Sequence, residues 1–267
     1  MKKVVLILSA AALSAAFVSC KNDKPTPQVS TDEVPEEMVE GTSQDLALAD
    51  ISEENASTTT YLYVTAYNGL SLREYNNLQS ERLAKMPYGT KVKVVTAEGK
   101  NTMNVAGIRG AMDEIEFNHK TGFAFNGYLS KYFPPERDIS AKGYASQLQE
   151  LFPKVGYEKT TGGTASVPET TETITLPEAE WHEAFFTAQR LFDFPKEFDF
   201  PKSKGKASEV IFDSKHKGSW TSQLEVNRAE DQLEKIAYVY QSEKYDRLVS
   251  ITPSETGMVI SMTETVK

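Results

Sequence analysis

A segment without any Lys or Arg, residues 25–72, limits which part of this 267-residue chain can fold into a globular structure. Nine acidic residues fall between Asp32 and Glu54, a number equal to the net charge of −9 of the whole chain. Like charges repel, and few aromatic residues are available here, so burial cannot offset the entropy lost on ordering. We therefore predict that residues 20–60 form an acidic, disordered tether and that folded structure begins at Tyr61.

The first 19 residues show the pattern of a secretory signal. Lys2 and Lys3 provide a positive start, and an apolar run over residues 4–17 follows. This run is shorter than the roughly 20 apolar residues that a membrane-spanning helix needs. We predict that residues 1–19 are a signal peptide and are removed.

The end of this signal, Phe17-Val18-Ser19-Cys20, resembles a bacterial lipobox. The resemblance implies that Cys20 becomes the first residue of the mature protein and carries fatty acyl chains such as palmitate, which anchor it to a membrane. Because Lys21 rather than Asp follows Cys20, the inner-membrane retention signal known from enteric bacteria is absent, and we expect the outer membrane. The alternative is a plain secretory signal cut near Ser19, which leaves a free thiol.

Charge and composition exclude several classes of function. The acidic balance gives no basic surface for nucleic acid, so we predict no nucleic-acid partner. One Cys and three His give no intramolecular disulfide and no recognised zinc spacing, so we predict no metal and no cofactor. In His182-Glu183-Ala184-Phe185-Phe186, a Phe stands where a zinc peptidase needs its second His, and we expect His182 at the surface near Glu178. We find no catalytic motif and predict that the protein is not an enzyme.

The segment after Tyr61 has the pattern of short, half-buried strands. Apolar and polar residues alternate over residues 70–73, 91–94 and 114–117. Pro87-Tyr88-Gly89 and the residues between Phe117 and Phe123 supply turns. This spacing predicts a small β-barrel.

Three motifs in this segment together resemble the bacterial SH3 (SH3b) family. They are Asn68-Gly69-Leu70-Ser71-Leu72-Arg73-Glu74, then Leu83-Ala84-Lys85-Met86-Pro87-Tyr88-Gly89-Thr90-Lys91-Val92, then Gly122-Phe123-Ala124-Phe125-Asn126-Gly127-Tyr128-Leu129-Ser130. The resemblance covers residues 61–132 and implies an SH3-like barrel that binds peptidoglycan or a peptide segment. Tyr75 and Tyr88 are the ligand-binding aromatics that we predict, and Tyr67, Phe125 and Tyr128 are further aromatics available in this region. The alternative is that these rings fill the core or rim of the barrel.

Pro134-Pro135 ends this predicted domain, since consecutive prolines do not continue a central strand. Helical periodicity follows over residues 139–152, and again from Pro177 to Phe192. Between them, Gly162-Gly163 and many Thr residues over residues 160–172 indicate a mobile loop. The rest predicts antiparallel strands, because the connections are short. The predicted strands span residues 209–213, 220–227, 234–241, 244–251 and 258–265.

The same pentapeptide occurs twice after the second predicted helix, as Phe192-Asp193-Phe194-Pro195-Lys196 and Phe198-Asp199-Phe200-Pro201-Lys202. Proline favours extended backbone in the residue before it. We interpret these Phe residues as caps on a core under the sheet edge. The alternative is an exposed partner surface, for which Phe194 and Phe200 are the candidate residues.

Taken together, the sequence predicts an all-β SH3-like barrel over residues 61–133, followed by an α+β two-layer domain over residues 136–267 in which two helices lie on an antiparallel sheet. We expect a lipid-anchored cell-envelope protein that acts as a non-enzymatic binding or scaffold protein for cell-wall or peptide ligands. Two alternatives stay open: a cell-wall hydrolase with its site in the C-terminal domain, and an interaction subunit of an envelope complex.

Overall fold

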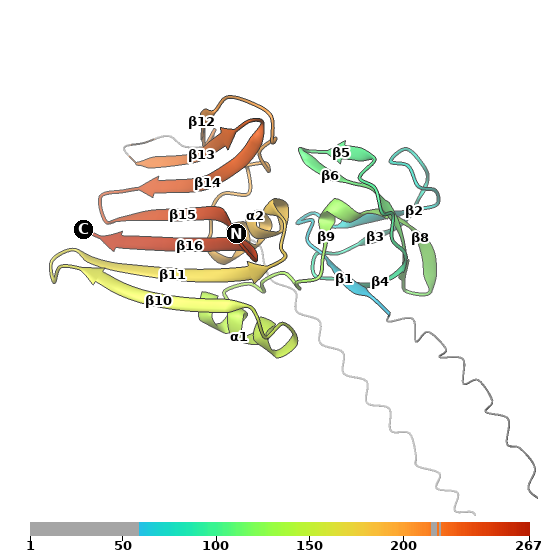
Figure 1. Cartoon of the computed structure of the whole chain (residues 1–267), viewed down its shortest axis with the longest axis horizontal. Helices are drawn as coiled ribbons and strands as arrows, with labels where there is room; N and C mark the ends of the chain where they lie inside the picture. The colour runs from blue at the N-terminus through green and yellow to red at the C-terminus, as the bar shows by residue number, and fades with distance from the viewer. Residues whose placement is uncertain (1–58, 215–217, 219) are drawn as a thin grey trace, which may run out of the picture. The chain divides into compact units, whose positions relative to one another are not determined.

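Antiparallel β-structure dominates the computed structural model, which describes residues 59–214, 218 and 220–267 (Figure 1). The predicted signal peptide, Cys20 and nearly all of the predicted tether lie outside the described residues. Among these residues, two sheets of seven strands and two α-helices make up most of the fold and belong to one compact unit. The boundary at Pro134-Pro135 therefore stays a prediction, although each sheet has a hydrophobic core of its own.

The first sheet contains the strands predicted from alternation, in the order β3-β2-β8-β7-β4-β1-β9. Leu72, Val92 and Ile115 point into its core and are almost fully buried. Its strands are β1 (Tyr61–Val64), β2 (Leu70–Arg73), β3 (Arg82–Met86), β4 (Lys91–Thr96), β7 (Met112–Phe117), β8 (Lys120–Phe125) and β9 (Leu129–Ser130). A separate hairpin of β5 (Met103–Val105) and β6 (Ile108–Gly110) and a 3-10 turn, η1 (Asn126–Tyr128), complete this part.

Among the described strands, the pairing of this sheet is open. It begins at β3 and ends at β9, and these two edge strands do not pair with each other. The structure thus confirms an antiparallel all-β region and shows no closed barrel. The sheet is weakest between β2 and β8, where the register has one residue pair, Arg73 with Phe123.

Gly69 is required by the turn that enters β2. Its φ is +81°, and a Cβ at this position would lie 2.7 Å from the backbone oxygen of Met86. An L side chain would meet both backbone strain and a clash.

The second sheet has the order β10-β11-β16-β15-β14-β13-β12, and all its neighbours are antiparallel, as predicted for its last five strands. The register places Ile174, Ile260, Ile251 and Ile236 in one row across four strands on the buried face. The strands are β10 (Gly156–Gly163), β11 (Pro168–Pro177), β12 (Ser208–Phe212), β13 (Thr221–Ala229), β14 (Gln232–Gln241), β15 (Tyr245–Ser254) and β16 (Gly257–Val266).

Two helices pack on this second sheet, as predicted. The first, α1 (Ala141–Leu151), contacts β10 and β11, and α2 (Trp181–Leu191) contacts β15 and β16. Tyr144 of α1 and Phe185 of α2 are fully buried in the core between helices and sheet. The α+β two-layer arrangement of this half is therefore present.

Two sequence predictions about this half are wrong. Residues 160–172 are not a loop, because β10 and β11 pair through most of this segment. Its many β-branched Thr residues suit a strand, and β11 is held on both sides by β10 and β16. Pro177 does not start a helix: it ends β11, and Glu178 follows with a φ of +60°, so α2 begins only at Trp181.

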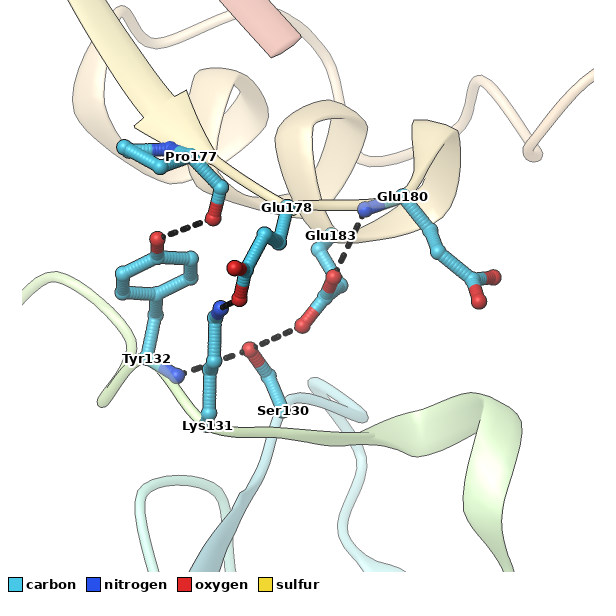
Figure 2. Close-up of polar contacts among 7 residues, drawn as sticks. All are labelled: Ser130, Lys131, Tyr132, Pro177, Glu178, Glu180 and Glu183. Atoms are coloured by element: carbon cyan, nitrogen blue, oxygen red, sulfur yellow. Dashed lines mark hydrogen bonds and ion pairs between the residues drawn. The ribbon is translucent and has the colours of Figure 1, made fainter. Parts of the chain in front are cut away.

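The chain between the two sheets makes polar contacts that join the two halves (Figure 2). The Lys131 ammonium lies 2.7 Å from the Glu178 carboxylate, and the Tyr132 hydroxyl donates to the Pro177 backbone oxygen at 2.6 Å. The Ser130 hydroxyl donates to the Glu183 carboxylate. Because these partners lie before and within α2, the contacts connect β9 to the start of that helix.

Glu183 has a double role at this junction. Its second carboxylate oxygen accepts a hydrogen bond from the backbone N–H of Glu180 at 2.7 Å, which satisfies one free donor at the helix start (Figure 2). Burial raises the pKa of the Glu183 carboxyl, and the hydrogen bonds from Ser130 and Glu180 oppose that shift.

Candidate functional site

A cleft of about 810 Å³ lies between the first sheet and the segment that follows α2. One wall comes from the loop between β1 and β2, with Tyr88 and Tyr128. The other comes from α2 and residues 193–200, which contain most of the repeated pentapeptide. Its volume is that of a site for a small organic ligand or a short peptide.

Buried phenylalanines fix the shape of the second wall. Phe194 and Phe198 are almost fully buried, with ring centres 5.4 and 5.9 Å from that of Tyr238 on β14. Gln189 on α2 donates from its side-chain nitrogen to the backbone oxygens of Pro195 and Phe198, at 3.1 and 2.9 Å. The repeat is thus anchored to the second core, as the interpretation of these Phe residues as core caps predicts.

The charged residues of the repeat lie on the opposite side from the buried rings. Asp193, Lys196, Glu197 and Asp199 are all exposed, and all four line the cleft. Phe194 and Phe198 are thus directed inward, while Asp193, with a φ of +53°, and the charged residues of the turn after Pro195 line the cleft.

Two cations and two tyrosines form one end of the cleft, which we call the basic end: Tyr67, Tyr88, Arg190 and Lys196. The Lys196 nitrogen lies 3.8 Å from the centre of the Tyr67 ring and donates to the Tyr67 hydroxyl. The Arg190 guanidinium lies 6.0 Å from the Tyr67 ring centre and 5.8 Å from that of Tyr88. These are cation–π distances, so the rings hold both cations in place.

The two tyrosine hydroxyls of the basic end have opposite pKa shifts. The hydrogen bond from Lys196 lowers the pKa of Tyr67, and the charges of Lys196, Arg190 and Arg137 lower it further. Burial raises the pKa of Tyr88 to about 12. The Tyr88 hydroxyl donates to the backbone oxygen of Pro135 at 3.4 Å.

Aromatic rings form a second part of the cleft, one helical turn before Arg190 on α2. The ring centre of Tyr128 lies 5.8 Å from that of Phe125 on β8 and 5.8 Å from that of Phe186 on α2. Tyr128 therefore connects β8 and α2. Burial raises the pKa of Tyr128, and the negative charge of Asp199 adds to this shift. Asp199 therefore acts on this end of the cleft, which we call the acidic end: Tyr128 and Asp199.

Thr65 lines the cleft and has a buried hydroxyl. The residue is 6% exposed, and its Oγ1 makes no hydrogen bond to any residue in the described part of the chain. Its backbone N–H donates to the Tyr128 backbone oxygen at 2.9 Å, which holds Thr65 beside the acidic end. A buried hydroxyl without a partner is unusual in a folded protein.

The structure brings together three of the four predicted ligand-binding residues. Tyr88, Phe194 and Phe200 line the cleft, although Phe194 is only 2% exposed and packs mainly on Tyr238. Tyr75 is 58% exposed in the loop between β2 and β3 and does not line the cleft. The possibility of an exposed patch formed by Phe194 is therefore excluded by its burial.

Sequence reasoning missed Thr65, Arg190 and Lys196 as members of this site. Each has an ordinary sequence context: a Thr after a strand, an Arg at the end of a helix and a Lys after a Pro. No pattern in the sequence singles them out, because the site forms from segments more than 100 residues apart.

The expected surface position of His182 is wrong. This side chain is buried, with its ring centre 6.3 Å from that of Phe200, and burial lowers its pKa to about 4. The carboxylate of Glu180 lies 3.4 Å from its Nδ1 but is largely exposed, so burial outweighs this nearby charge. The ring of His182 is neutral at physiological pH and packs in the core below α2.

Comparison with known proteins assigns no family to this fold. No protein-family model matches the chain, and neither the curated proteins nor the solved structures contain a match. Within the described residues, no group of His, Cys, Asp and Glu is arranged to hold a metal ion. No helix in the same part of the chain is long and apolar enough to cross a membrane.

Proposed function

We propose that this protein is a lipid-anchored binding protein of the bacterial cell envelope, and that the cleft is its binding site for a peptide or cell-wall ligand. The observation that carries the proposal is the cleft itself. It has the volume of a ligand site, and its walls combine aromatic rings with charged groups from both halves of the fold. Such walls bind by apolar burial and fix orientation by a few polar contacts.

The resemblance to SH3b domains supports the choice of ligand class. Its first and third motifs supply Gly69, Leu70 and Tyr128 to the cleft, and Tyr88 comes from the second. The antiparallel sheet over residues 61–130 agrees with an SH3-like arrangement, which we propose for this half. The ligand site would then lie on the SH3-like half, closed on one side by the repeated pentapeptide.

Binding without catalysis is supported by the positions of the buried ionisable groups. His182 and Glu183 are the groups of α2 with shifted pKa values, and neither lines the cleft. Glu183 is engaged by Ser130 and by the start of α2, and His182 is packed against Phe200. Both have structural roles, which favours a binding protein over a hydrolase.

The proposed location depends on Cys20. Lipid on Cys20 would hold the folded part at a membrane through the acidic tether, and Lys21 favours the outer membrane. Cys20→Ser should abolish labelling by a radioactive or clickable fatty acid and release the protein from the membrane fraction. Normal processing and unchanged membrane association in this variant would refute the anchor.

A matched pair of tyrosines tests the binding site. Tyr67 and Tyr75 are 45% and 58% exposed, but only Tyr67 lines the cleft. Tyr67→Ala should weaken binding to purified cell-wall sacculi by about tenfold in a pull-down titration, a loss typical of a contacting aromatic. Tyr75→Ala should bind as the unaltered protein does. Equal binding by both variants, or a loss only in Tyr75→Ala, would place the ligand elsewhere.

A further inference from the structure

Charges of opposite sign act on two different tyrosines of the cleft lining. Lys196 and Arg190 lie against the Tyr67 ring, and the charges that influence the Tyr67 hydroxyl are all cationic, although Asp193 and Glu197 line the same cleft. One helical turn earlier on α2, Phe186 packs against Tyr128, and the charge of Asp199, which also lines the cleft, acts on the Tyr128 hydroxyl. The cations and Asp199 therefore act on tyrosines that contact α2 one helical turn apart, at Arg190 and Phe186.

The cations of the basic end are held by rings and not by carboxylates. No ion pair joins Arg190 or Lys196 to an acidic residue in the part of the chain that the structure describes. A guanidinium beside an aromatic ring keeps N–H groups that can donate hydrogen bonds to a planar carboxylate. The basic end is thus suited to receive an anionic group.

The Thr65 hydroxyl is an independent indication of a ligand. Thr65 is more than nine-tenths buried and lines the cleft, and no described residue makes a hydrogen bond with its hydroxyl. Tyr67 is two residues further along the chain, and the Tyr128 backbone oxygen accepts from the Thr65 N–H, so Thr65 is close in the chain or in space to both tyrosines. A peptide N–H or C=O group would satisfy it.

We propose that the cleft binds a short peptide with both ends free, with its carboxylate at Arg190 and Lys196, its ammonium group at Asp199, and a backbone group on the Thr65 hydroxyl. This inference rests on the proposed function and specifies its ligand class. The aromatic rings of Phe125, Phe186 and Phe200 would cover small apolar side chains. A neutral glycan would leave the separated charges without partners, so a dipolar peptide is the better fit.

Trialanine is a suitable probe because its only charges are at its two ends. The full-length processed protein in detergent would be titrated, by NMR, with trialanine, its C-terminal amide, its N-acetyl derivative and the doubly blocked peptide. We expect binding of the free peptide, and a loss of about tenfold for each blocked end, because each block removes a charge-assisted hydrogen bond.

Variants of the cleft residues test which residue binds each end of the peptide. Arg190→Gln should remove the effect of amidation and keep that of acetylation, and Asp199→Asn should do the reverse. Thr65→Val has nearly the same shape and should weaken all four peptides, while its melting temperature rises because a buried hydroxyl without a partner is removed. A purely structural role for Thr65 would change the melting temperature alone.

Several outcomes would overturn the proposal. Equal binding of the free and doubly blocked peptides, or unchanged binding by Thr65→Val, contradicts the dipolar ligand. If sacculi bind and no trialanine derivative does, the ligand class is wrong while the binding function stands. If neither binds, both proposals fail.

Discussion

The ammonium nitrogen of Lys196 lies 3.8 Å from the centre of the Tyr67 ring, although 129 residues separate the two in sequence. This contact joins the repeated pentapeptide to the loop between β1 and β2, and so connects the two walls of the cleft. It also defines the charge of the basic end, because Tyr67 is exposed and Lys196 is its nearest cation.

Loss of this cation should change the titration of Tyr67. Lys196→Gln removes the hydrogen bond and the charge that favour the phenolate, so the pKa of Tyr67 should rise toward the ordinary value of about 10. NMR of ring-labelled tyrosine, followed through alkaline pH, measures this. Lys204→Gln is the control, since Lys204 pairs with Asp231 and lies outside the cleft. An unchanged Tyr67 titration in Lys196→Gln would contradict the contact.

The junction of the two halves should depend on Glu183 more than on Glu178. Glu183→Ala leaves the Ser130 hydroxyl and the Glu180 N–H without their acceptor, and should lower the free energy of unfolding by about 1–3 kcal/mol. Glu178→Ala breaks an ion pair whose carboxylate is 81% exposed, so it should cost about 0–1 kcal/mol. Urea unfolding of both variants gives the comparison, and equal losses would show that Glu183 is not a buried partner.

Acid should destabilise the protein through His182. Its folded-state pKa is about 4, against an ordinary value of 6.5, so its contribution to stability is present above pH 6.5 and is lost as pH falls through 4. The full loss is about 3 kcal/mol.

Stability measured between pH 7 and pH 4 tests this contribution. His182→Gln should flatten the curve over that range. His119→Gln, in the exposed turn between β7 and β8, should keep the slope of the unaltered protein. If both variants keep the slope, another group causes the acid sensitivity.

Two glycines with the same backbone conformation should differ in their tolerance of a methyl group. Gly69 and Gly89 have φ of +81° and +79°, so Ala is strained at both by about 1–2 kcal/mol. Only at Gly69 does the added Cβ also meet a backbone oxygen, that of Met86, at 2.7 Å; at Gly89 it meets open space. Thermal unfolding should show a clearly larger loss for Gly69→Ala, and equal losses would mean that the turn before β2 relaxes freely.

Local pattern was sufficient to predict most of the elements. Strict alternation predicted β2, β4 and β7, because one face of each packs on a core and the other faces solvent. The apolar stripe after Trp181 predicted α2, and short connections predicted the antiparallel order of β13 to β16. These features depend on residues close in sequence.

The structure of residues 160–172 was not predictable in this way. Their Thr-rich composition suits both a loop and a strand. β10 lies at the sheet edge and pairs with β11, and β11 is held on its other side by β16, which follows about 90 residues later. The same is true of His182, which is buried with its ring beside that of Phe200, 18 residues later in the chain.

The sequence by itself therefore determined most of the strands, the presence of both helices and the anchoring of the repeat by its Phe residues, because each follows from local periodicity and apolar burial. Only the tertiary structure decided the cleft. Thr65, Arg190, Lys196 and Asp199 meet there because two separate cores are joined through Tyr132 and Glu183, and pattern within a segment carries no information about which distant side chains that packing brings together.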